Sequence, residues 1–279
     1  MAEPPLKALA SRDNPSIKRL HALAHSARDR RKLGETVLDG AHLVECALAA
    51  GIPVLALAVS EAGLLRAEHR RLLAALPVEV PRYRLGDALF AHVSPVDSPS
   101  GLLATIAMPA SAPAAVPDAS LIVLDGVQDP GNLGSLLRTA AAAGIGHALL
   151  GDGCAHAWSP RALRAGMGAQ FALRIEEGCD LLERLEAYPG LCLATALRAD
   201  ARPLYELDLR CPVAWLFGAE GQGLSPALLA RADRCVTIPM AVGIESLNVA
   251  AAAAVCLFEQ RRQNLPGPAI SPTPRTSAG

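Results

Sequence analysis

The sequence predicts an α/β protein of about two domains, and three observations support this expectation. The chain has 279 residues, which corresponds to about two domains at roughly 150 residues each. Apolar residues make up 51% of the chain, enough for a sizeable hydrophobic core. Short apolar runs alternate with helix-like stretches, which is typical of a sheet covered by helices.

We expect the first domain at residues 1–108, as a small α/β module. Helix-like stretches and short apolar runs alternate there, at 17–27, 41–50, 54–59 and 102–106. A stretch rich in Pro and Ala follows, and we assign residues 109–119 to a linker.

The second domain is expected at residues 120–263, with a mostly parallel sheet. Its strand-like runs and its first helix are predicted at 121–124, 148–150, 191–194, 213–217 and 133–143. The runs are apolar throughout, as expected for parallel strands that are buried on both faces. After Gln263 the chain has four prolines and no periodicity, which predicts a disordered tail at 264–279.

Composition argues against several classes of protein. The 26 Lys and Arg residues nearly balance the 27 Asp and Glu residues, so the chain as a whole is not a basic nucleic-acid-binding tail. The longest strongly apolar run, 47–59, is shorter than the ~20 residues that span a bilayer.

No signal peptide is visible, so we expect a cytoplasmic protein. The seven cysteines have neither C-x-x-C spacing nor a histidine partner at finger spacing, and we expect no metal.

The N-terminal segment is locally basic. Its first 33 residues carry eight Lys and Arg residues against three acidic ones, an excess of five. Such a cluster is either a solvated helix face or a phosphate-binding patch, and the pattern leaves both readings open. The candidate phosphate-binding residues are Lys18, Arg28, Arg30, Arg31 and Lys32.

Three loops that follow predicted strands combine glycines with polar side chains. They carry Arg138 in the first loop, Glu220 in the second, and Ser246 and Asn248 in the third. Ligands of parallel sheets bind at the carboxyl ends of strands, so these groups can converge on one crevice. Any single loop is better explained as a tight strand-to-helix turn, but three in one domain favour a binding site.

Several familiar sites are absent from the sequence. It contains no phosphate-binding G-x-x-x-x-G-K-[ST] loop, no G-x-G-x-x-G after a predicted strand and no G-x-S-x-G elbow. None of the seven histidines falls in the three loops. The sequence therefore gives no support for a mechanism that uses a metal or a histidine base.

Residues 132–140, 216–224 and 238–250 resemble, in order and spacing, the three motifs of the SpoU (TrmH-like) family of RNA ribose 2′-O-methyltransferases, in the SPOUT superfamily. The resemblance covers roughly residues 120–262. One nearby position departs from the pattern, because Gly166 stands where a serine is expected.

A fainter resemblance continues upstream. Residues 14–44 and 98–104 are similar to the L30e-like substrate-binding module that precedes the catalytic domain in many rRNA-modifying members. Here Asp39 replaces the usual glutamate, and Ser100 stands where glutamine is common. The resemblance implies that the basic N-terminal residues bind RNA phosphates.

The family resemblance also implies a fold, a cofactor and an assembly. It implies a trefoil knot in the C-terminal sheet, S-adenosyl-L-methionine bound among the knot loops, and a homodimer through the knot region. The stretch 245–263 is expected to be a helix that is apolar nearly all round, which suits the dimer contact. Burial within one subunit explains that pattern equally well.

By resemblance, the catalytic residues are Arg138, Asn132, Glu220, Ser246 and Asn248. Arg138 is assigned to activate the ribose hydroxyl, but a guanidinium whose pKa exceeds ~12 is a poor base. Binding the adjacent phosphate and stabilising a developing alkoxide is physically easier. We expect cofactor contacts from Leu216, Gly218, Gly221, Gly223, Ile238, Met240 and Leu247.

The predicted activity is ribose methylation of RNA, with 23S rRNA favoured over tRNA by analogy with relatives that carry the same module. An inactive RNA- or ribosome-binding assembly factor is an alternative of another class. A different nucleotide-dependent enzyme, such as a dehydrogenase, is disfavoured by the missing fingerprints. The target nucleotide cannot be read from the sequence.

Overall fold

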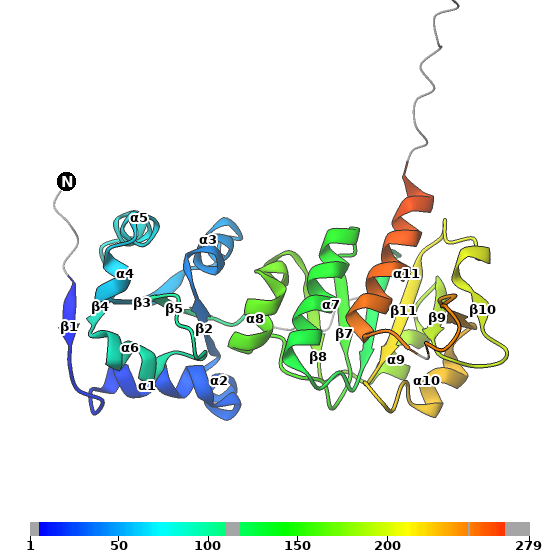
Figure 1. Ribbon diagram of the computed structural model, residues 1–279, viewed down its shortest axis with the longest axis horizontal. Helices are drawn as coiled ribbons and strands as arrows, with labels where there is room; N and C mark the ends of the chain where they lie inside the picture. The colour runs from blue at the N-terminus through cyan, green and yellow to red at the C-terminus, as the bar shows by residue number, and fades with distance from the viewer. Residues whose placement is uncertain (1–5, 110–117, 245, 266–279) are drawn as a thin grey trace, which may run out of the picture.

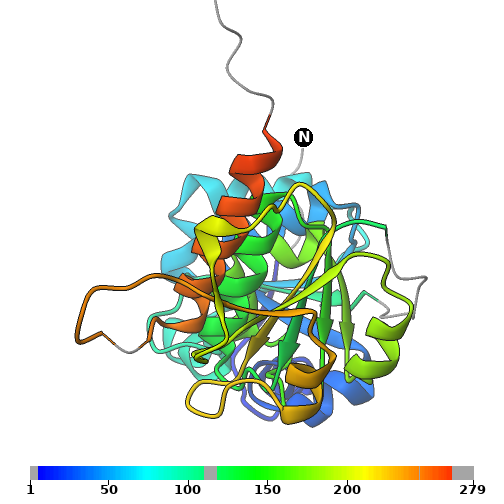
Figure 2. The same ribbon diagram turned by 90° about the vertical axis from the view of Figure 1, so that its right-hand side faces the viewer.

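The computed structural model describes residues 6–109, 118–244 and 246–265, and it contains two sheets that lie side by side (Figure 1). Figure 2 looks along the molecule from the C-terminal sheet. The predicted linker falls mostly on 110–117, and the predicted tail mostly on 266–279, so both lie largely outside the described residues. Among the described residues, no helix is long and apolar enough to cross a membrane.

The N-terminal module has a five-stranded sheet with strand order β1-β4-β3-β5-β2. Strand β5 is antiparallel to both β2 and β3, and the other pairs are parallel. The strands are β1 (Lys7–Leu9), β2 (Glu35–Asp39), β3 (Val54–Ser60), β4 (Arg82–Leu85) and β5 (Leu102–Ala107). The helices are α1 (Pro15–His25), α2 (Ala27–Leu33), α3 (Ala41–Ala49), α4 (Glu61–Leu64), α5 (Ala67–Ala75) and α6 (Asp87–Val93).

The predicted helix at 17–27 corresponds to α1, which ends before Ser26, and a second helix, α2, begins directly after this residue. This residue has an extended backbone, and its side chain accepts a hydrogen bond from the Asp29 amide, so it ends α1 and caps α2. The second helix carries the basic residues Arg28, Arg30, Arg31 and Lys32.

The C-terminal sheet has seven strands in the order β10-β12-β9-β11-β6-β7-β8, and all of its pairs are parallel. The predicted parallel sheet is thus confirmed. The strands are β6 (Leu121–Asp125), β7 (His147–Leu150), β8 (Arg174–Glu177), β9 (Leu191–Thr195), β10 (Arg202–Pro203), β11 (Val213–Gly218) and β12 (Arg234–Thr237). The helices are α7 (Pro130–Ala143), α8 (Pro160–Gly166), α9 (Leu181–Glu186), α10 (Pro226–Arg231) and α11 (Val249–Asn264), with short 3-10 turns η1 (Ala169–Ala172) and η2 (Leu204–Glu206).

Two hydrophobic layers enclose this sheet. Helices α7, α8 and α11 pack on one face, whereas α9 and α10 cover the other. Strand β11 contributes to both layers because its side chains alternate: Trp215 and Phe217 face the first, and Leu216 faces the second. Burial of aromatic and aliphatic side chains such as these stabilises a fold by roughly 1.5–3 kcal/mol each.

Helix α7 begins and ends at residues suited to those positions. The Asp129 side chain accepts a hydrogen bond from the Asn132 amide, Pro130 occupies the first turn, and Gly144 ends the helix in the left-handed conformation. Gly134 lies against α8 so closely that a Cβ there would overlap the Ala162 carbonyl oxygen. The two helices therefore pack backbone to backbone.

Helix α11 differs from its predicted span of 245–263. It begins at Val249, because the Asn248 side chain caps it by accepting hydrogen bonds from the amides of Ala250 and Ala251. Glu245 lies outside the described residues. The helix ends at Asn264, whose side chain donates to the carbonyl oxygens of Leu209 and Gln260, so Asn264 does not belong to the predicted tail.

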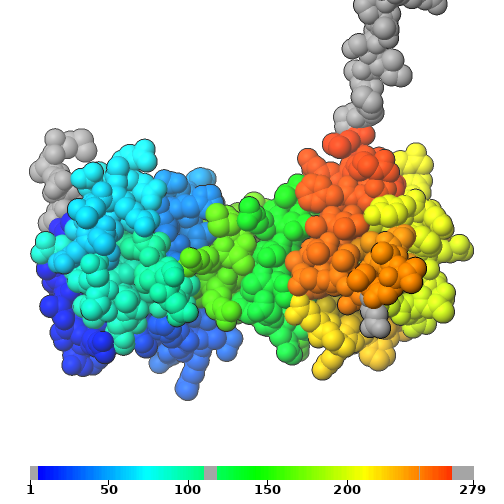
Figure 3. All heavy atoms as spheres, in the orientation of Figure 1, coloured from blue at the N-terminus to red at the C-terminus, as the bar shows by residue number. Residues whose placement is uncertain are grey.

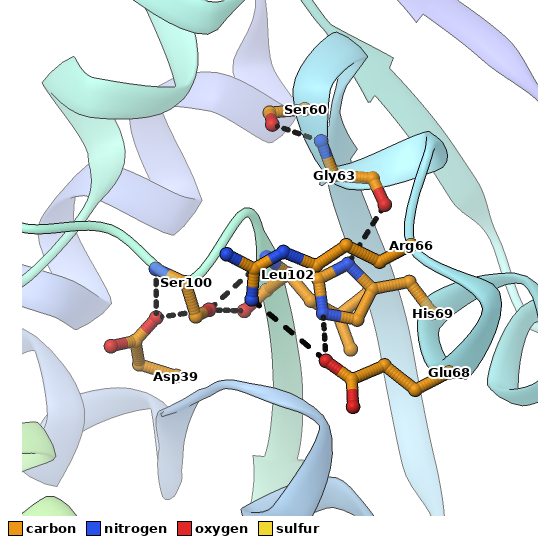
Figure 4. Close-up of polar contacts among 8 residues, drawn as sticks. All are labelled: Asp39, Ser60, Gly63, Arg66, Glu68, His69, Ser100 and Leu102. Carbon is orange, nitrogen blue, oxygen red and sulfur yellow. Dashed lines mark hydrogen bonds and ion pairs between the residues drawn. The ribbon is translucent and has the colours of Figure 1, made fainter.

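Strand β2 and helix α3 of the module contact α8 and the residues around it. The buried Thr36 hydroxyl donates to the Trp158 carbonyl oxygen at 2.6 Å, and Arg164 forms an ion pair with Asp39 at 3.0 Å. Asp39 also accepts a 2.6 Å hydrogen bond from the Ser100 hydroxyl, as Figure 4 shows. The two module positions that depart from the expected Glu and Gln thus bind each other.

Candidate active site

One polar residue from each of the three predicted loops meets the other two at the carboxyl edge of the C-terminal sheet. Asn132 lies at the start of α7, Glu220 lies in the loop after β11, and Asn248 lies at the start of α11. The Asn132 side-chain amide donates to Glu220 Oε1. Asn248 Nδ2 donates to Asn132 Oδ1 at 3.0 Å and to Glu220 Oε1 at 3.2 Å. Side chains separated by more than 100 residues in the sequence thus form one cluster.

Local structure determines how this amide–carboxylate cluster is oriented. Because Asn248 Oδ1 accepts from the first amides of α11, its Nδ2 is turned toward Glu220. The Glu220 loop is a tight turn, closed by two backbone hydrogen bonds between Ala219 and Gly223. Gly221 and Gly223 have positive φ angles of 87° and 70°, which glycine adopts readily.

A pocket of about 750 Å³ opens beside the cluster. Six of the seven predicted cofactor contacts line it: Gly218, Gly221, Gly223, Ile238, Met240 and Leu247. A Cβ on Gly218 would overlap the backbone of Gly223 and Leu224, so only glycine fits that wall. Apolar walls and close backbone approach suit a flat adenosine group, and the lining residues therefore fit the predicted S-adenosyl-L-methionine.

Leu216, which was also expected to contact the cofactor, is not among the residues that line the pocket. Its side chain is fully buried in the layer beneath α9 and α10, because strand alternation turns it away from the pocket. Its carbonyl oxygen accepts a 3.0 Å hydrogen bond from the Thr195 hydroxyl, and Thr195 is a lining residue. Leu216 thus contacts the pocket through this bond.

The two remaining predicted catalytic residues lie apart from the amide–carboxylate cluster. Ser246 is exposed and lines the pocket. Arg138 is exposed on α7, six positions after Asn132, and is not a lining residue. Within the described part of the chain it has no ion-pair partner, so its guanidinium is available to an external anion.

Four of the five predicted RNA-binding residues are exposed, and Arg30 is the exception. Lys18 forms a 2.9 Å ion pair with Asp13, and Arg28, Arg31 and Lys32 are exposed on α2. Arg30 is buried and donates to the carbonyl oxygens of Leu23 and Ala24 near the end of α1. The prediction was wrong for Arg30, because its side chain satisfies helix-terminal carbonyl groups instead of facing solvent.

Charged residues of α2 affect a histidine at the carboxyl edge of the C-terminal sheet. His156 follows β7, and its Nε2 lies 3.5 Å from Glu177 at the end of β8. Burial and the nearby charges of Arg30 and Arg31 lower the pKa of His156 to about 4. Burial raises the pKa of the Glu177 carboxyl group. His156 is therefore neutral at neutral pH.

Sequence reasoning did not identify the loop after β9. Thr195 at the end of β9 and Arg198 in this loop line the pocket, but the loop contains no glycine and belongs to none of the three motifs. Polar residues directly after the apolar run 191–194 were the available signal. Across the described ranges, no group of three or more His, Cys, Asp or Glu side chains could hold a metal ion.

The fold and the site define an α/β enzyme that binds a nucleoside-containing cofactor at the carboxyl edge of a parallel sheet. The sequence profile of the SpoU rRNA Methylase family matches residues 119–258, and that of the MRM3-like substrate binding domain matches residues 14–104. The chain belongs to the SpoU rRNA methylase family. It is an S-adenosylmethionine-dependent RNA 2′-O-methyltransferase.

Three known proteins are similar over most of this chain. An uncharacterized tRNA/rRNA methyltransferase from Synechocystis is 36% identical, across 92% of this chain and 94% of its own length. The 23S rRNA (guanosine(2553)-2′-O)-methyltransferase RlmP of Bacillus subtilis is 32% identical, across 92% and 100%. The SpoU methyltransferase AviRb from Streptomyces viridochromogenes, solved with AdoMet, has a TM-score of 0.78 at 27% identity and covers 90% of this chain and 98% of its own.

Proposed function

We propose that this protein methylates a ribose 2′-hydroxyl group of 23S rRNA. The amide–carboxylate cluster beside the pocket carries this proposal, because it places an oriented carboxylate next to the site that fits the cofactor. The rRNA substrate is supported by the similarity to RlmP and by the match to the MRM3-like substrate binding domain.

The protein's own groups bind and orient the reacting hydroxyl. The two amide hydrogen bonds that Glu220 accepts are both made to Oε1, so Oε2 is available to accept a hydrogen bond from the ribose 2′-hydroxyl. When bound, S-adenosyl-L-methionine supplies an electrophilic methyl group on a sulfonium. Correct positioning of two reacting groups provides ~7–11 kcal/mol of such a barrier.

Arg138 binds the phosphate next to the reacting ribose in this proposal. The residue is exposed on the same helix that carries Asn132, and a guanidinium matches the geometry of a phosphate. Its positive charge also stabilises negative charge that develops on the attacking oxygen. Proton removal by Arg138 itself is disfavoured by its basicity.

The homodimer is also part of the proposal. In the single chain α11 buries Ala253 and Leu257 against its own subunit and leaves Ala251 and Phe258 exposed. The preceding loop exposes Ile244. Exposed apolar surface of this kind favours contact with a second copy. We expect a dimer in light scattering and a monomer for Phe258→Glu. The trefoil knot and the cytoplasmic location stay predictions.

Transfer of tritiated methyl groups tests the activity. Purified protein and labelled S-adenosyl-L-methionine are incubated with 23S rRNA or with tRNA, and resistance of the product to alkaline cleavage identifies ribose methylation. We expect label in rRNA, with an Arg138→Ala variant slower by ~10²–10³-fold. Arg210→Ala, which removes an exposed arginine paired with Asp208, is the matched control.

The alternative of an inactive assembly factor makes the opposite prediction. If the protein binds the cofactor and rRNA but labels neither naked rRNA nor ribosomal precursors, the enzymatic proposal is wrong. If only tRNA takes up label, the proposed reaction is correct, but 23S rRNA is not the substrate.

A further inference from the structure

A second hollow opens next to the cofactor pocket, at the outer edge of the C-terminal sheet. It has a volume of about 820 Å³ and shares Arg198 and Leu229 with the wall of the cofactor pocket. We call it the edge groove, and its charged lining residues are Arg198, Arg202, Arg234, Asp200 and Asp233. Helix α10 forms its apolar wall.

Two arginines of the edge groove are available to a ligand. Arg198 is held by Asp200, with its Nε 2.9 Å from Oδ1 and its Nη2 3.3 Å from Oδ2. Asp233 accepts the Cys192 amide at 2.7 Å. Arg202 and Arg234 are exposed, and neither forms an ion pair with any residue that the structure describes.

The strand register places these two residues diagonally across from each other. They lie on the neighbouring strands β10 and β12, where Arg202 is opposite Val236, two positions beyond Arg234. With Arg198 and Asp200 neutralising each other, the groove keeps two arginines against Asp233, an excess of one positive charge. Exposed arginine side chains at the edge of a sheet suit a phosphate backbone, because phosphate oxygens accept paired N–H hydrogen bonds from a guanidinium.

The edge groove lies on the far side of the cofactor pocket from the N-terminal module. The module contacts α8 at the β8 end of the sheet, whereas β10 and β12 form the opposite end. Figures 1 and 3 show the module and the segment around residue 200 at opposite ends of the molecule. An RNA chain whose reacting ribose enters the pocket extends in both directions from it, and the groove borders the pocket through the shared residues Arg198 and Leu229.

We propose that the edge groove binds the phosphate backbone of the RNA substrate through Arg202 and Arg234, on the side of the reacting nucleotide away from the module. The proposal rests on the proposed function for the identity of the RNA. The protein therefore holds its substrate on both sides of the pocket: the module holds one side and the outer sheet edge holds the other.

The test compares the double variant R202Q/R234Q with R70Q/R71Q, which removes the same charge from two exposed arginines of α5. Arg198 is left unchanged because it also lines the cofactor pocket. Filter binding of radiolabelled 23S rRNA transcript is measured from 50 to 400 mM KCl. Calorimetry with S-adenosyl-L-methionine reports the cofactor pocket in each variant.

We expect R202Q/R234Q to weaken RNA binding by roughly tenfold near physiological salt and to reduce the slope of log K against log[salt] by ~2, about one per lost phosphate contact. Cofactor affinity and the unfolding midpoint should equal those of the wild type. Unchanged RNA binding would overturn the proposal, as would an equal loss in R70Q/R71Q, which would indicate a general charge effect.

Failure of the proposed function gives a different pattern. If wild-type protein transfers no methyl group to 23S rRNA but R202Q/R234Q alone binds the transcript more weakly, the groove is an RNA site and only the substrate is wrong. If the wild type methylates rRNA and both double variants bind it as tightly as the wild type, the groove proposal fails and the function stands.

Discussion

The two sheets of this protein bring their loops together in different ways. In the C-terminal sheet every strand pair is parallel, so the loops after β9, β11 and β12 all reach one edge and line one pocket. In the module, β5 runs antiparallel to its neighbours β2 and β3, so its loops are divided between the two edges. Strand direction therefore decides where dispersed residues can converge on a site.

The largest expected effect comes from adding one methyl group at matched positions in the two domains. A Cβ on Gly218 would overlap Gly223, and a Cβ on Gly63 in the module would overlap the Gly101 carbonyl oxygen. We expect Gly218→Ala to weaken cofactor binding and slow methyl transfer by at least ~100-fold, because the pocket wall must shift. Gly63→Ala should instead lower the free energy of unfolding by ~1–3 kcal/mol and keep cofactor affinity. Calorimetry and urea unfolding measure both.

Gly86→Ala is the control for both variants. Gly86 has an ordinary φ of −61°, and no atom lies within 4 Å of an added Cβ. It should behave as the wild type. Equal loss of cofactor affinity in Gly63→Ala and Gly218→Ala would show that the pocket depends on the module.

The next effect concerns the amide–carboxylate cluster. Glu220→Gln removes the charge that strengthens the hydrogen bonds from Asn132 and Asn248, and such bonds contribute ~1.5–3 kcal/mol. We expect methyl transfer to slow by ~10–100-fold while cofactor affinity is kept. Glu186→Gln, at an exposed position of α9, should have no effect. An unchanged rate of methyl transfer for Glu220→Gln would show that the cluster takes no part in the mechanism.

A smaller effect separates two adjacent arginines of the module. Arg30→Met leaves the Leu23 and Ala24 carbonyl groups without their donor and should lower the free energy of unfolding by ~1–3 kcal/mol. Arg31→Gln should leave stability unchanged and reduce the salt slope of RNA binding by ~1. Denaturant unfolding and filter binding give the two values. A reduced salt slope with full stability in Arg30→Met would contradict the buried role of Arg30.

The smallest effect is a dependence of stability on pH through His156. Because the pKa of this residue is lowered to about 4, the unfolded chain binds its proton first as pH falls below ~6.5. Stability from this residue is therefore present above pH ~6.5 and is lost toward pH 4, with a loss of about 1 kcal/mol between pH 7 and 5.5. The raised pKa of Glu177 acts in the opposite direction.

Urea unfolding at pH 7 and 5.5 measures this change. His156→Gln has no titrating ring and should remove this part of the pH dependence. The same pH dependence in the variant and the wild type would assign it to other groups.

The sequence identified the central strands of the catalytic sheet well, because strands buried on both faces are continuous apolar runs. The run 213–217, for example, corresponds to β11 (Val213–Gly218). The edge strands β8 and β10 were not predicted. Strand β8 reads Arg-Ile-Glu-Glu and β10 has only two residues, so neither shows an apolar run.

The sequence also predicted part of the site. Motif resemblance and parallel strands together placed Asn132, Glu220 and Asn248 in one region, where the structure brings them into contact. The orientation of a side chain depends on packing between elements, which the sequence pattern does not contain. For this reason Leu216, which was expected to contact the cofactor, turns its side chain away from the pocket, and Arg30, which was expected to bind RNA, is buried.

The close packing at Gly134 has a consequence for target choice. Helix α7, which carries Asn132, contacts α8 backbone to backbone, and α8 holds the module through Arg164 and Asp39. The module, the helix pair and the pocket are thus connected by direct contacts. For a structured RNA, these contacts set the distance between the module and the pocket. We expect the methylated nucleotide to be selected by its separation from the RNA feature that the module is proposed to bind. An insertion between the two in the RNA should then move the methyl group to a different nucleotide.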